Sequence, residues 1–441
     1  MDPLASGLNP LAVELNNVIR TDAPAVFRLL SELGRALYFP KGILTQTAEA
    51  KEKAHRYNAT IGEAREQQQA MGLPSIIRLV SGLSPNEILP YAPAAGRSDL
   101  RKLWKEHIKQ ENPSLGDTAI SLPVVTTGIT HGLSTVADMF FDQGEVLLLP
   151  DKVWGNYRMI FGLKRGARLG TYPLLTAEGG FDLEGFSRAV RAQTVMGRVS
   201  VLFNFPNNPV GYTVTKQEAE AICDVIVEAA DKHGCDVLAI CDDAYFGLFY
   251  GDSPFRESLF SLLAGAHPRV LAIKLDGASK EDYAWGLRVG FLTYGISGGA
   301  PIYEALEKKT AGCIRATVSN ASNLSQSLLV KAMQDPAYQA ERAEKYNILA
   351  RRAAKALEVL ADPKFAKVWS LYPFNSGYFL CVRLHHIDAE QYRLKLLNDY
   401  GVGVISTSDT DIRVAISCVE EEDIPDLFAV MLQCALEMKG E

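Results

Sequence analysis

The chain has 441 residues, of which 47% are hydrophobic and 22% are charged, and its formal net charge is -7 at pH 7. This length and composition are typical of a globular protein with a large core, built as one big domain and a smaller one. The acidic balance argues against a dedicated binder of nucleic acid or of an anionic membrane, because such proteins normally present a basic face.

The start of the chain and its cysteines bear on the compartment. Met1-Asp2-Pro3-Leu4 lacks the basic and apolar regions of a secretory signal, and no later run reaches about 18 uncharged apolar residues. The seven cysteines are scattered and form no C-x-x-C pair. We therefore expect a cytoplasmic protein with free thiols, no disulfides and no metal site.

The N-terminal segment, residues 1–75, is predicted to be mostly helical between about Pro10 and Met71. Apolar residues recur at helical spacing near Phe27, and a long polar stretch runs from Ala48 to Gln69. Its acidic and basic residues are balanced, which gives no support for a DNA-binding head. We expect this segment to pack on the small domain or on a second subunit.

Residues 76–325 form the predicted large domain, where short β-type runs alternate with amphipathic helical patterns such as Lys216–Lys232. The β-type runs are Val124–Thr126, Glu145–Leu149, Val199–Asn204, Val237–Cys241, Val270–Ile273 and Val289–Thr293. This alternation predicts an α/β fold, in which a mostly parallel sheet is covered by helices on both faces. Ligands of such folds lie beyond the carboxyl ends of the strands.

Residues 326–441 form the predicted small domain, which we expect to be α+β. The pattern changes to long helices, then to strand-like and helical segments in turn. The expected elements are helices at Ser325–Met333, Pro336–Leu360 and Ala389–Tyr400, and strands at Gly377–Leu384 and Ile412–Ser417.

Lys280 is the first candidate for chemistry. It follows the apolar run Val270–Ile273 in a stretch of small residues, where its amine could be held partly desolvated. Such an amine loses its proton more easily and becomes a nucleophile for aldehydes. The alternative is that Lys280 and Arg288 are two surface cations in a loop.

Two further segments at strand ends favour a ligand site. The segment Thr126–Leu133 leaves a strand and opens a helix, whose free N–H groups and dipole could take a phosphate, although such turns are common. Asp242 ends the apolar strand Val237–Cys241, where a carboxylate is costly unless it is paired.

Four motifs then occur in one order: Asn207–Gly211, Asp242–Tyr245, Lys280 and Arg413. In this order they resemble the signature of the fold-type I (class I/II) aminotransferases that use pyridoxal 5′-phosphate (PLP), and the motifs are closest to those of the aspartate and aromatic enzymes. The resemblance runs from about Ile77 to the C-terminus. It implies a large domain with a mostly parallel seven-stranded sheet between helices, and a smaller α+β domain.

The resemblance also implies roles for residues around the cofactor ring. Lys280 would form the resting imine with PLP and then move the proton between the substrate α-carbon and C4′. Asp242, which the Asp-x-Ala-Tyr spacing selects over Asp243, would pair with the pyridine nitrogen and keep the ring an electron sink. Asn208 and Tyr245 would donate to the phenolic oxygen, and Asn208 also to the substrate carboxylate.

The phosphate of PLP is assigned by resemblance to the helix start and to Arg288, whose guanidinium would grip it bidentately. The helix-start residues are Gly128, Ile129 and Thr130. One position departs from the family, because Gly277 stands where a serine often binds the phosphate. That hydrogen bond is either missing or supplied by Ser279.

Three more residues complete the predicted site. Trp154 resembles the tryptophan that stacks on the cofactor ring and borders the substrate, the alternative being a core tryptophan. Tyr91 resembles the tyrosine that reaches the phosphate of the neighbouring subunit, although a tyrosine in a proline-rich turn would look the same. Gly82 is assigned to the substrate site, at an unusually short spacing from Tyr91.

The substrate prediction depends on two arginines. Arg413 matches the arginine that binds the α-carboxylate of the amino acid. Arg315, 35 residues after Lys280, resembles the arginine that crosses the dimer interface to bind a distal carboxylate, the alternative being an ordinary interface cation. We therefore expect a homodimer with shared sites that acts on an amino acid and a 2-oxo acid.

The expected reaction is transamination in two half-reactions, with aspartate or glutamate as donor and 2-oxoglutarate as acceptor. Aromatic amino acids are the second choice of donor. A PLP-dependent lyase or decarboxylase remains an alternative, because the same apparatus serves those reactions. A sensing module without turnover is disfavoured by the presence of the lysine, and a nicotinamide-dependent dehydrogenase by the absence of a G-x-G-x-x-G motif after the first strand.

Overall fold

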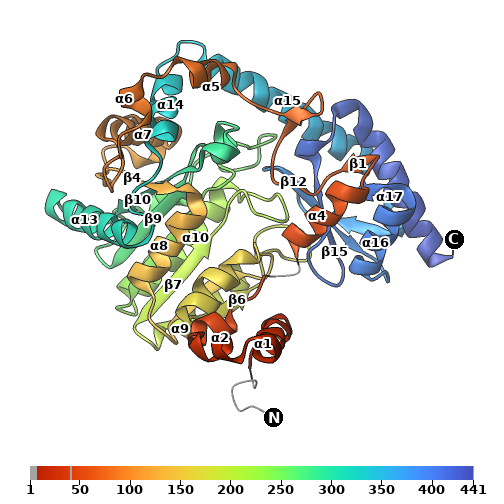
Figure 1. Cartoon of the computed structure of the whole chain (residues 1–441), viewed down its shortest axis with the longest axis horizontal. Coiled ribbons are helices and arrows are strands. Elements are labelled where there is room, and N and C mark those ends of the chain that lie inside the picture. Colours follow the sequence, from red (N-terminus) through yellow and green to blue (C-terminus); the bar gives the residue numbers. More distant parts are fainter. Residues whose placement is uncertain (1–6, 40–41, 441) are drawn as a thin grey trace.

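The computed structural model describes residues 7–39 and 42–440. Residues 1–4, from which we expect no secretory signal, lie outside the described residues. Figure 1 shows a larger domain beside a smaller one that carries the C-terminus. In the described ranges, no helix combines the length and apolarity needed to cross a membrane. All seven cysteines are free thiols, as predicted, and five of them are buried.

The large domain is built on a seven-stranded sheet in the order β4-β10-β9-β8-β7-β5-β6. Its strands are β4 (Val124–Thr127), β5 (Val146–Pro150), β6 (Arg168–Tyr172), β7 (Arg198–Phe203), β8 (Asp236–Asp242), β9 (Val270–Asp276) and β10 (Val289–Gly295). Only β10 runs antiparallel to its neighbours β4 and β9. The predicted mostly parallel sheet is confirmed, and each predicted β-type run of this domain coincides with one of its strands.

The strand β6 was not predicted, and its position explains why. It lies at the edge of the sheet and buries only its last residue, Tyr172. An edge strand with exposed polar positions lacks the apolar run that marks the central strands.

The two faces of the sheet bury alternate residues, because successive side chains of a strand point to opposite sides. Val199, Val201 and Phe203 of β7 pack into one core, whereas Leu202 packs into the other. Helices cover both faces (Figure 1). The helices of this domain are α5 (Pro74–Leu79), α6 (Pro85–Ile88), α7 (Ser98–Glu111), α8 (Gly128–Phe140), α9 (Leu183–Thr194), α10 (Lys216–Asp231), α11 (Leu259–Leu263), α12 (Ala278–Glu281), α13 (Ala300–Thr317) and α14 (Asn323–Met333).

The small domain has a four-stranded antiparallel sheet in the order β11-β12-β15-β14. Its elements are α15 (Tyr338–Leu360), β11 (Trp369–Leu371), β12 (Phe379–Leu384), α16 (Ala389–Tyr400), β13 (Val402–Gly403), β14 (Ile405–Ser406), β15 (Asp411–Ala415) and α17 (Ile424–Lys439). The long helix α15 reaches from the large domain into the small one (Figure 1). Gly401 ends α16 in the left-handed conformation that favours glycine.

The N-terminal segment is helical only in its first part. The helices are α1 (Pro10–Asp22), α2 (Pro24–Leu29), α3 (Glu32–Ala36) and α4 (Ile43–Lys53), and the short strands β1 (Tyr57–Asn58), β2 (Arg65–Glu66) and β3 (Gln69–Ala70) follow. The prediction that the chain stays mostly helical as far as about Met71 is wrong. The chain after Lys53 is extended because β1 pairs in parallel with β13 and buries Ala59 and Thr60, so tertiary pairing overrides the local pattern.

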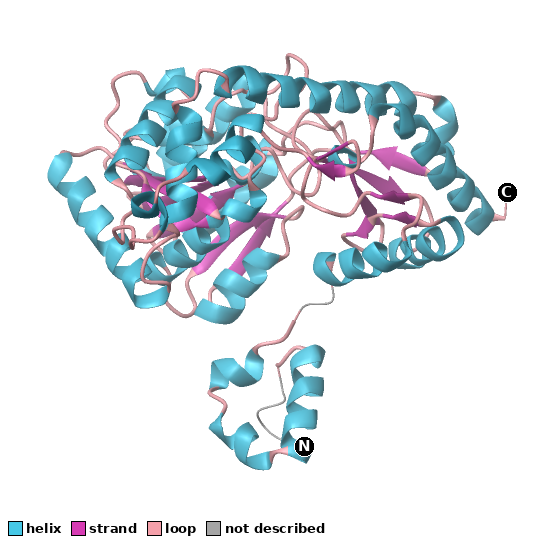
Figure 2. Cartoon of the chain, turned by 45° about the horizontal axis from the view of Figure 1, so that its top comes forward, coloured by secondary structure: helices cyan, strands magenta, loops and turns pink. Residues whose placement is uncertain are grey.

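The parts of this segment pack in different places. The helix α4 lies on the small domain, where Gln46 donates to Ser406 Oγ at 3.0 Å and accepts from Ser406 N at 2.9 Å. The helices α1–α3 form a separate group at the bottom of Figure 2. They share a cavity of about 680 Å³ with residues 163–166 of the large domain.

Candidate active site

A pocket of about 210 Å³ lies at the carboxyl edge of the large sheet, where side chains of the small domain join it. Such an edge is where ligands of open α/β sheets bind. Eight predicted site residues line the pocket: Ile129, Thr130, Trp154, Asn208, Asp242, Tyr245, Lys280 and Arg413. Residues from the ends of five strands, β4, β5, β7, β8 and β9, and from β15 are thus brought together from positions up to 284 residues apart, between Ile129 and Arg413.

Lys280 enters the pocket from the short helix α12, which directly follows β9. Its Nζ lies 5.1 Å from the centre of the Tyr245 ring. The pKa of Lys280 is lowered to about 8, chiefly by burial; the Asp242 carboxylate opposes this shift and the Arg288 charge adds to it. Lys280 can therefore present an uncharged amine near neutral pH, as the attack on an aldehyde requires.

Asp242 ends β8 and is only 2% exposed. Its carboxylate accepts a hydrogen bond from the Tyr157 hydroxyl at 2.5 Å and one from the Ala244 N–H at 3.1 Å. Burial raises the pKa of Asp242 to about 6, against the effect of the Tyr157 hydrogen bond. A carboxylate in this position favours a cationic partner, and a protonated pyridine nitrogen fits that requirement.

Tyr157 was not among the predicted site residues. It follows Trp154 by three residues in the same turn, and the two rings meet edge to face at 5.4 Å and 90°. The Tyr157 side chain is fully buried, as an aromatic residue of the core would be. The available signal was the position of a second hydroxyl-bearing aromatic residue close behind the predicted stacking residue.

The start of α8 and Arg288 form a cationic corner. Gly128 has φ +73°, and a Cβ on it would lie 2.4 Å from Arg288 Nη2, so the guanidinium lies against the first turn of the helix. Arg288 itself precedes β10, whose antiparallel direction puts its first residue at this same edge. Free N–H groups, the helix dipole and a guanidinium together fit a phosphate group.

Gly277, where the family often has serine, is explained by packing. A Cβ at this position would lie 2.6 Å from the Val289 carbonyl oxygen and 2.8 Å from Gly290 Cα. Glycine therefore lets the chain turn from β9 into α12 close against β10. The neighbouring Ser279 is buried in α12.

Arg413 projects from β15 of the small domain and is 1% exposed. Its Nη1 donates to Asn208 Oδ1 at 3.0 Å, its Nη2 donates to the Thr60 carbonyl at 2.9 Å, and its guanidinium lies 4.0 Å from the centre of the Phe379 ring. Burial lowers the pKa of Arg413 to about 10. Within the described chain, its buried Nε has no hydrogen-bond partner, so a donor is left for a substrate carboxylate.

The N-terminal segment contributes Ile43 and Gly62 to the pocket, and neither was predicted. A Cβ on Gly62 would lie 3.5 Å from Phe379 Cζ and 3.6 Å from the Tyr245 hydroxyl. The sequence gives no signal for Gly62, because the pattern predicts a helix in this stretch. Gly82, the glycine assigned to the substrate, is exposed at the end of the 3₁₀ turn Val80–Gly82 and does not line this pocket.

Tyr91 and Arg315 also lie outside the pocket of their own chain. Tyr91 is 91% exposed. Arg315 lies in the last turn of α13, is exposed, and donates to the Ser319 hydroxyl. The roles predicted for both residues belong to the site of a second subunit, so they stay predictions.

Comparisons with known proteins agree with this geometry. The family described as "Aminotransferase class I and II" matches residues 57–430. The probable aspartate/prephenate aminotransferase of Aquifex aeolicus is 26% identical over 325 residues, which cover 73% of this chain and 76% of the relative. The aspartate aminotransferase of Bacillus subtilis is 24% identical over 298 residues, which cover 67% of this chain and 70% of the relative.

Solved structures share the fold. An aminotransferase of Anaerococcus prevotii has a TM-score of 0.79 at 25% identity, over 90% of this chain and 96% of the other. The kynurenine aminotransferase of Pyrococcus horikoshii, solved in complex with PMP, has a TM-score of 0.78 at 16% identity, over 94% of this chain and 98% of the other. Because the family match spans residues 57–430, most of the sequence, the chain belongs to the class I and II aminotransferases, enzymes that use PLP as their cofactor.

Proposed function

We propose that this enzyme transfers the amino group of an L-amino acid, with aspartate as the preferred donor and 2-oxoglutarate as the acceptor. One observation carries the proposal. The amine of Lys280, whose pKa burial lowers to about 8, shares a pocket with the buried Asp242 carboxylate and with a guanidinium, Arg413, that has a donor to spare. These groups suit an aldehyde, a pyridinium and a carboxylate respectively.

Bound PLP supplies an aldehyde and an electron-poor ring. The residues around it would hold that ring in one orientation. Asp242 would accept from the ring nitrogen, Asn208 and Tyr245 would donate to the phenolic oxygen, and Trp154 would offer its face to the ring. The first turn of α8 and Arg288 would bind the phosphate.

Lys280 would move the proton. With the substrate amino group on the cofactor, the free Nζ of Lys280 would take the proton from the substrate α-carbon and would return it to the neighbouring carbon of the cofactor. A pKa of about 8 suits both directions, because the amine is then neither always charged nor always neutral near neutral pH. Arg413 and Asn208 hold the α-carboxylate and so orient the α-hydrogen toward Nζ.

The distal carboxylate of aspartate needs another cation. Lys280 and Arg413 are the only cationic side chains among the described residues that line the pocket. We therefore propose that Arg315 of a second copy supplies the missing charge in a homodimer with shared sites, in the cytoplasm, where free thiols stay reduced. Aspartate aminotransferases among the relatives support this choice of substrate.

Aromatic amino acids are the second candidate donors. Trp154, Tyr245 and Phe379 line the pocket and offer apolar faces to a ring.

A donor panel with 2-oxoglutarate tests the proposal, run on the wild type, on Arg315→Ala and on Arg188→Ala. Arg188 is a matched control, because it is an exposed helical arginine that pairs with Glu184 on its own helix. We expect the wild type to convert aspartate to oxaloacetate, and Arg315→Ala to lose about tenfold or more in kcat/KM for dicarboxylates only, as expected for one lost charge-assisted contact. An unchanged dicarboxylate preference would remove the substrate assignment, and release of ammonia or pyruvate would indicate a lyase.

A further inference from the structure

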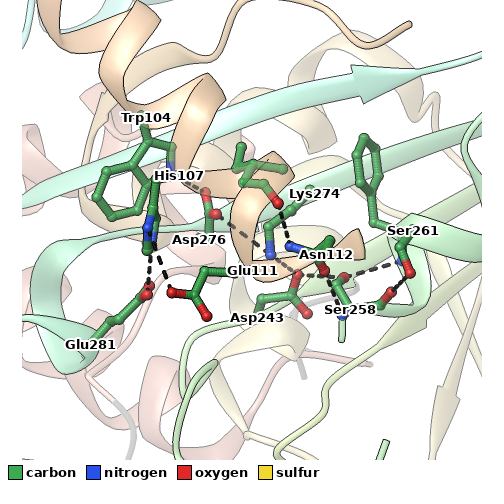
Figure 3. Close-up of polar contacts among 12 residues, drawn as sticks. Trp104, His107, Glu111, Asn112, Asp243, Ser258, Ser261, Lys274, Asp276 and Glu281 are labelled. Atoms are coloured by element: carbon green, nitrogen blue, oxygen red, sulfur yellow. Dashed lines mark hydrogen bonds and ion pairs between the residues drawn. The ribbon is translucent and has the colours of Figure 1, made fainter. Parts of the chain in front are cut away.

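A buried charge cluster lies on the far side of Asp242 from the pocket. Asp243, the next residue, is 5% exposed, and its carboxylate accepts from Lys274 Nζ at 2.5 Å and from Ser258 Oγ at 2.7 Å. Figure 3 shows Lys274 between Asp243 and Asp276, with Ser258 on the other side of Asp243. None of these residues lines the cofactor pocket.

Lys274 joins the ends of two strands that carry the site. It lies on β9, opposite Cys241 of β8, one residue before Asp242. Its Nζ is 3.5 Å from Asp276 Oδ2 and 4.2 Å from the centre of the Phe246 ring. The side chain is 1% exposed, so water does not screen these interactions.

Two buried carboxylates, Asp243 and Asp276, balance the charge of Lys274. Asp276 also accepts from Trp104 Nε1 at 3.1 Å (Figure 3). Glu281 on α12 is the next acidic group, and it is paired with His107 and Arg342. Coulombic attraction from Asp243 and Asp276 overcomes the burial of Lys274 and raises its pKa, so it stays charged.

The peptide group between Asp242 and Asp243 is hydrogen-bonded through both its carbonyl and its N–H. The Asp242 carbonyl accepts from Asn204 Nδ2 at 2.9 Å, and the Asp243 N–H donates to the Leu275 carbonyl at 2.8 Å. Lys274 adds a charged anchor on the side chain of Asp243. Removing one partner of a buried ion pair leaves the other charge uncompensated, so the backbone and side chain of Asp243 would have to move.

Such a movement would reach the cofactor site through one residue. The Asp242 carboxylate can serve a ring nitrogen only if its direction is fixed, because charge-assisted hydrogen bonds depend on geometry. We propose that Lys274 is a positioning residue, which fixes Asp243 and thereby aims the Asp242 carboxylate at the cofactor ring. This inference rests on the role proposed above for Asp242.

The test compares three variants of the full-length enzyme. Lys274→Met removes the anchor. Ser258→Ala is a milder change that removes one hydrogen bond to Asp243, in case the first variant does not fold. Arg269→Met is the matched control, because Arg269 pairs with Asp236 at 2.8 Å at the opposite, exposed end of the same two strands.

Three properties of the folded protein are measured: the dissociation constant for PLP, the pH at which the absorbance of the lysine-bound cofactor changes, and kcat and KM separately. For Lys274→Met we expect a dissociation constant about tenfold higher, equivalent to one lost charge-assisted hydrogen bond. The absorbance transition should move up by about one pH unit, because a less firmly held ring proton no longer repels the proton on the lysine nitrogen. The value of kcat should fall about tenfold while KM stays within about threefold, since carbanion stabilisation acts in the transition state.

Ser258→Ala should shift the same properties in the same direction by about twofold to threefold, as for a partial loss of one neutral hydrogen bond. Arg269→Met should leave them unchanged. If Lys274→Met and Ser258→Ala lower only the unfolding temperature, and bind PLP and turn over as the wild type does, Lys274 is merely structural and the inference is overturned. If the wild type itself forms no adduct between PLP and Lys280, the proposed function is overturned as well.

Discussion

Replacing Lys280 by methionine is predicted to stabilise the cofactor-free protein. In the unfolded chain the pKa of this lysine has its ordinary value of 10.5, whereas burial lowers it to about 8 in the fold. The folded state therefore disfavours the charged form that dominates at neutral pH. A difference of about 2.5 pKa units corresponds to about 3 kcal/mol, which methionine, with no charge to bury, does not lose.

The dependence on pH gives this prediction its direction. Between about pH 8 and 10.5 the unfolded chain still binds a proton at Lys280 and the folded chain does not, so the stability of the wild type rises with pH across this window. The advantage of Lys280→Met should thus be complete below about pH 8 and vanish toward pH 10.5.

Urea unfolding of both cofactor-free proteins at pH 7, 8, 9 and 10 measures this difference. Lys308→Met is the control, because Lys308 is an exposed lysine on α13 that pairs only with Glu304 in the described structure. It should change the free energy of unfolding by less than about 0.5 kcal/mol at every pH. The claim that burial destabilises the charged amine of Lys280 would be refuted by either of two results: a Lys280→Met protein no more stable than the wild type, or a stability difference that does not shrink as the pH rises.

Three further variants test other parts of the site. Arg413→Lys loses the planar fork, so kcat/KM for amino acids should fall about 10- to 100-fold in steady-state assays, with no change for an amine that lacks the carboxylate. Tyr157→Phe removes a hydrogen bond that holds down the pKa of Asp242, so the acid limb of the pH–activity profile should move to higher pH by about one unit; an unmoved limb would contradict this. Gly277→Ser should destabilise the protein by about 1–3 kcal/mol in thermal unfolding, because its Cβ would lie 2.6 Å from the Val289 carbonyl oxygen, and tighter PLP binding by this variant would contradict the packing argument.

The elements that carry the site could be predicted because they are buried. The strands β7, β8 and β9 are central in a parallel sheet and give apolar runs that end at a polar residue. The end of such a run marks the edge of the sheet where ligands bind, so the position of Asp242 and Lys280 predicts that they are site residues. The edge strand β6 has no such run.

The missed residues depend on contacts between distant parts of the chain. Gly62 reaches the pocket only because β1 pairs with β13, a partner more than 340 positions away, and nothing in its own stretch indicates that pairing. The role of Tyr157 follows from its contact with the Asp242 carboxylate, and Lys274 is recognisable only from its contact with the carboxylate of Asp243. A lysine directly after the predicted run Val270–Ile273 is expected to face solvent, whereas Lys274 lies inside β9 and is buried between two carboxylates.

The central claim is that Lys280 carries the cofactor while Asp242 keeps its ring charged. The most direct measurement is borohydride reduction of the PLP-loaded protein, followed by peptide mass spectrometry, on the wild type and on Asp242→Asn. We predict a reduced cofactor adduct on Lys280 in both proteins, with weaker PLP retention in Asp242→Asn. An adduct on another lysine, or a wild-type protein that forms none, would contradict the account.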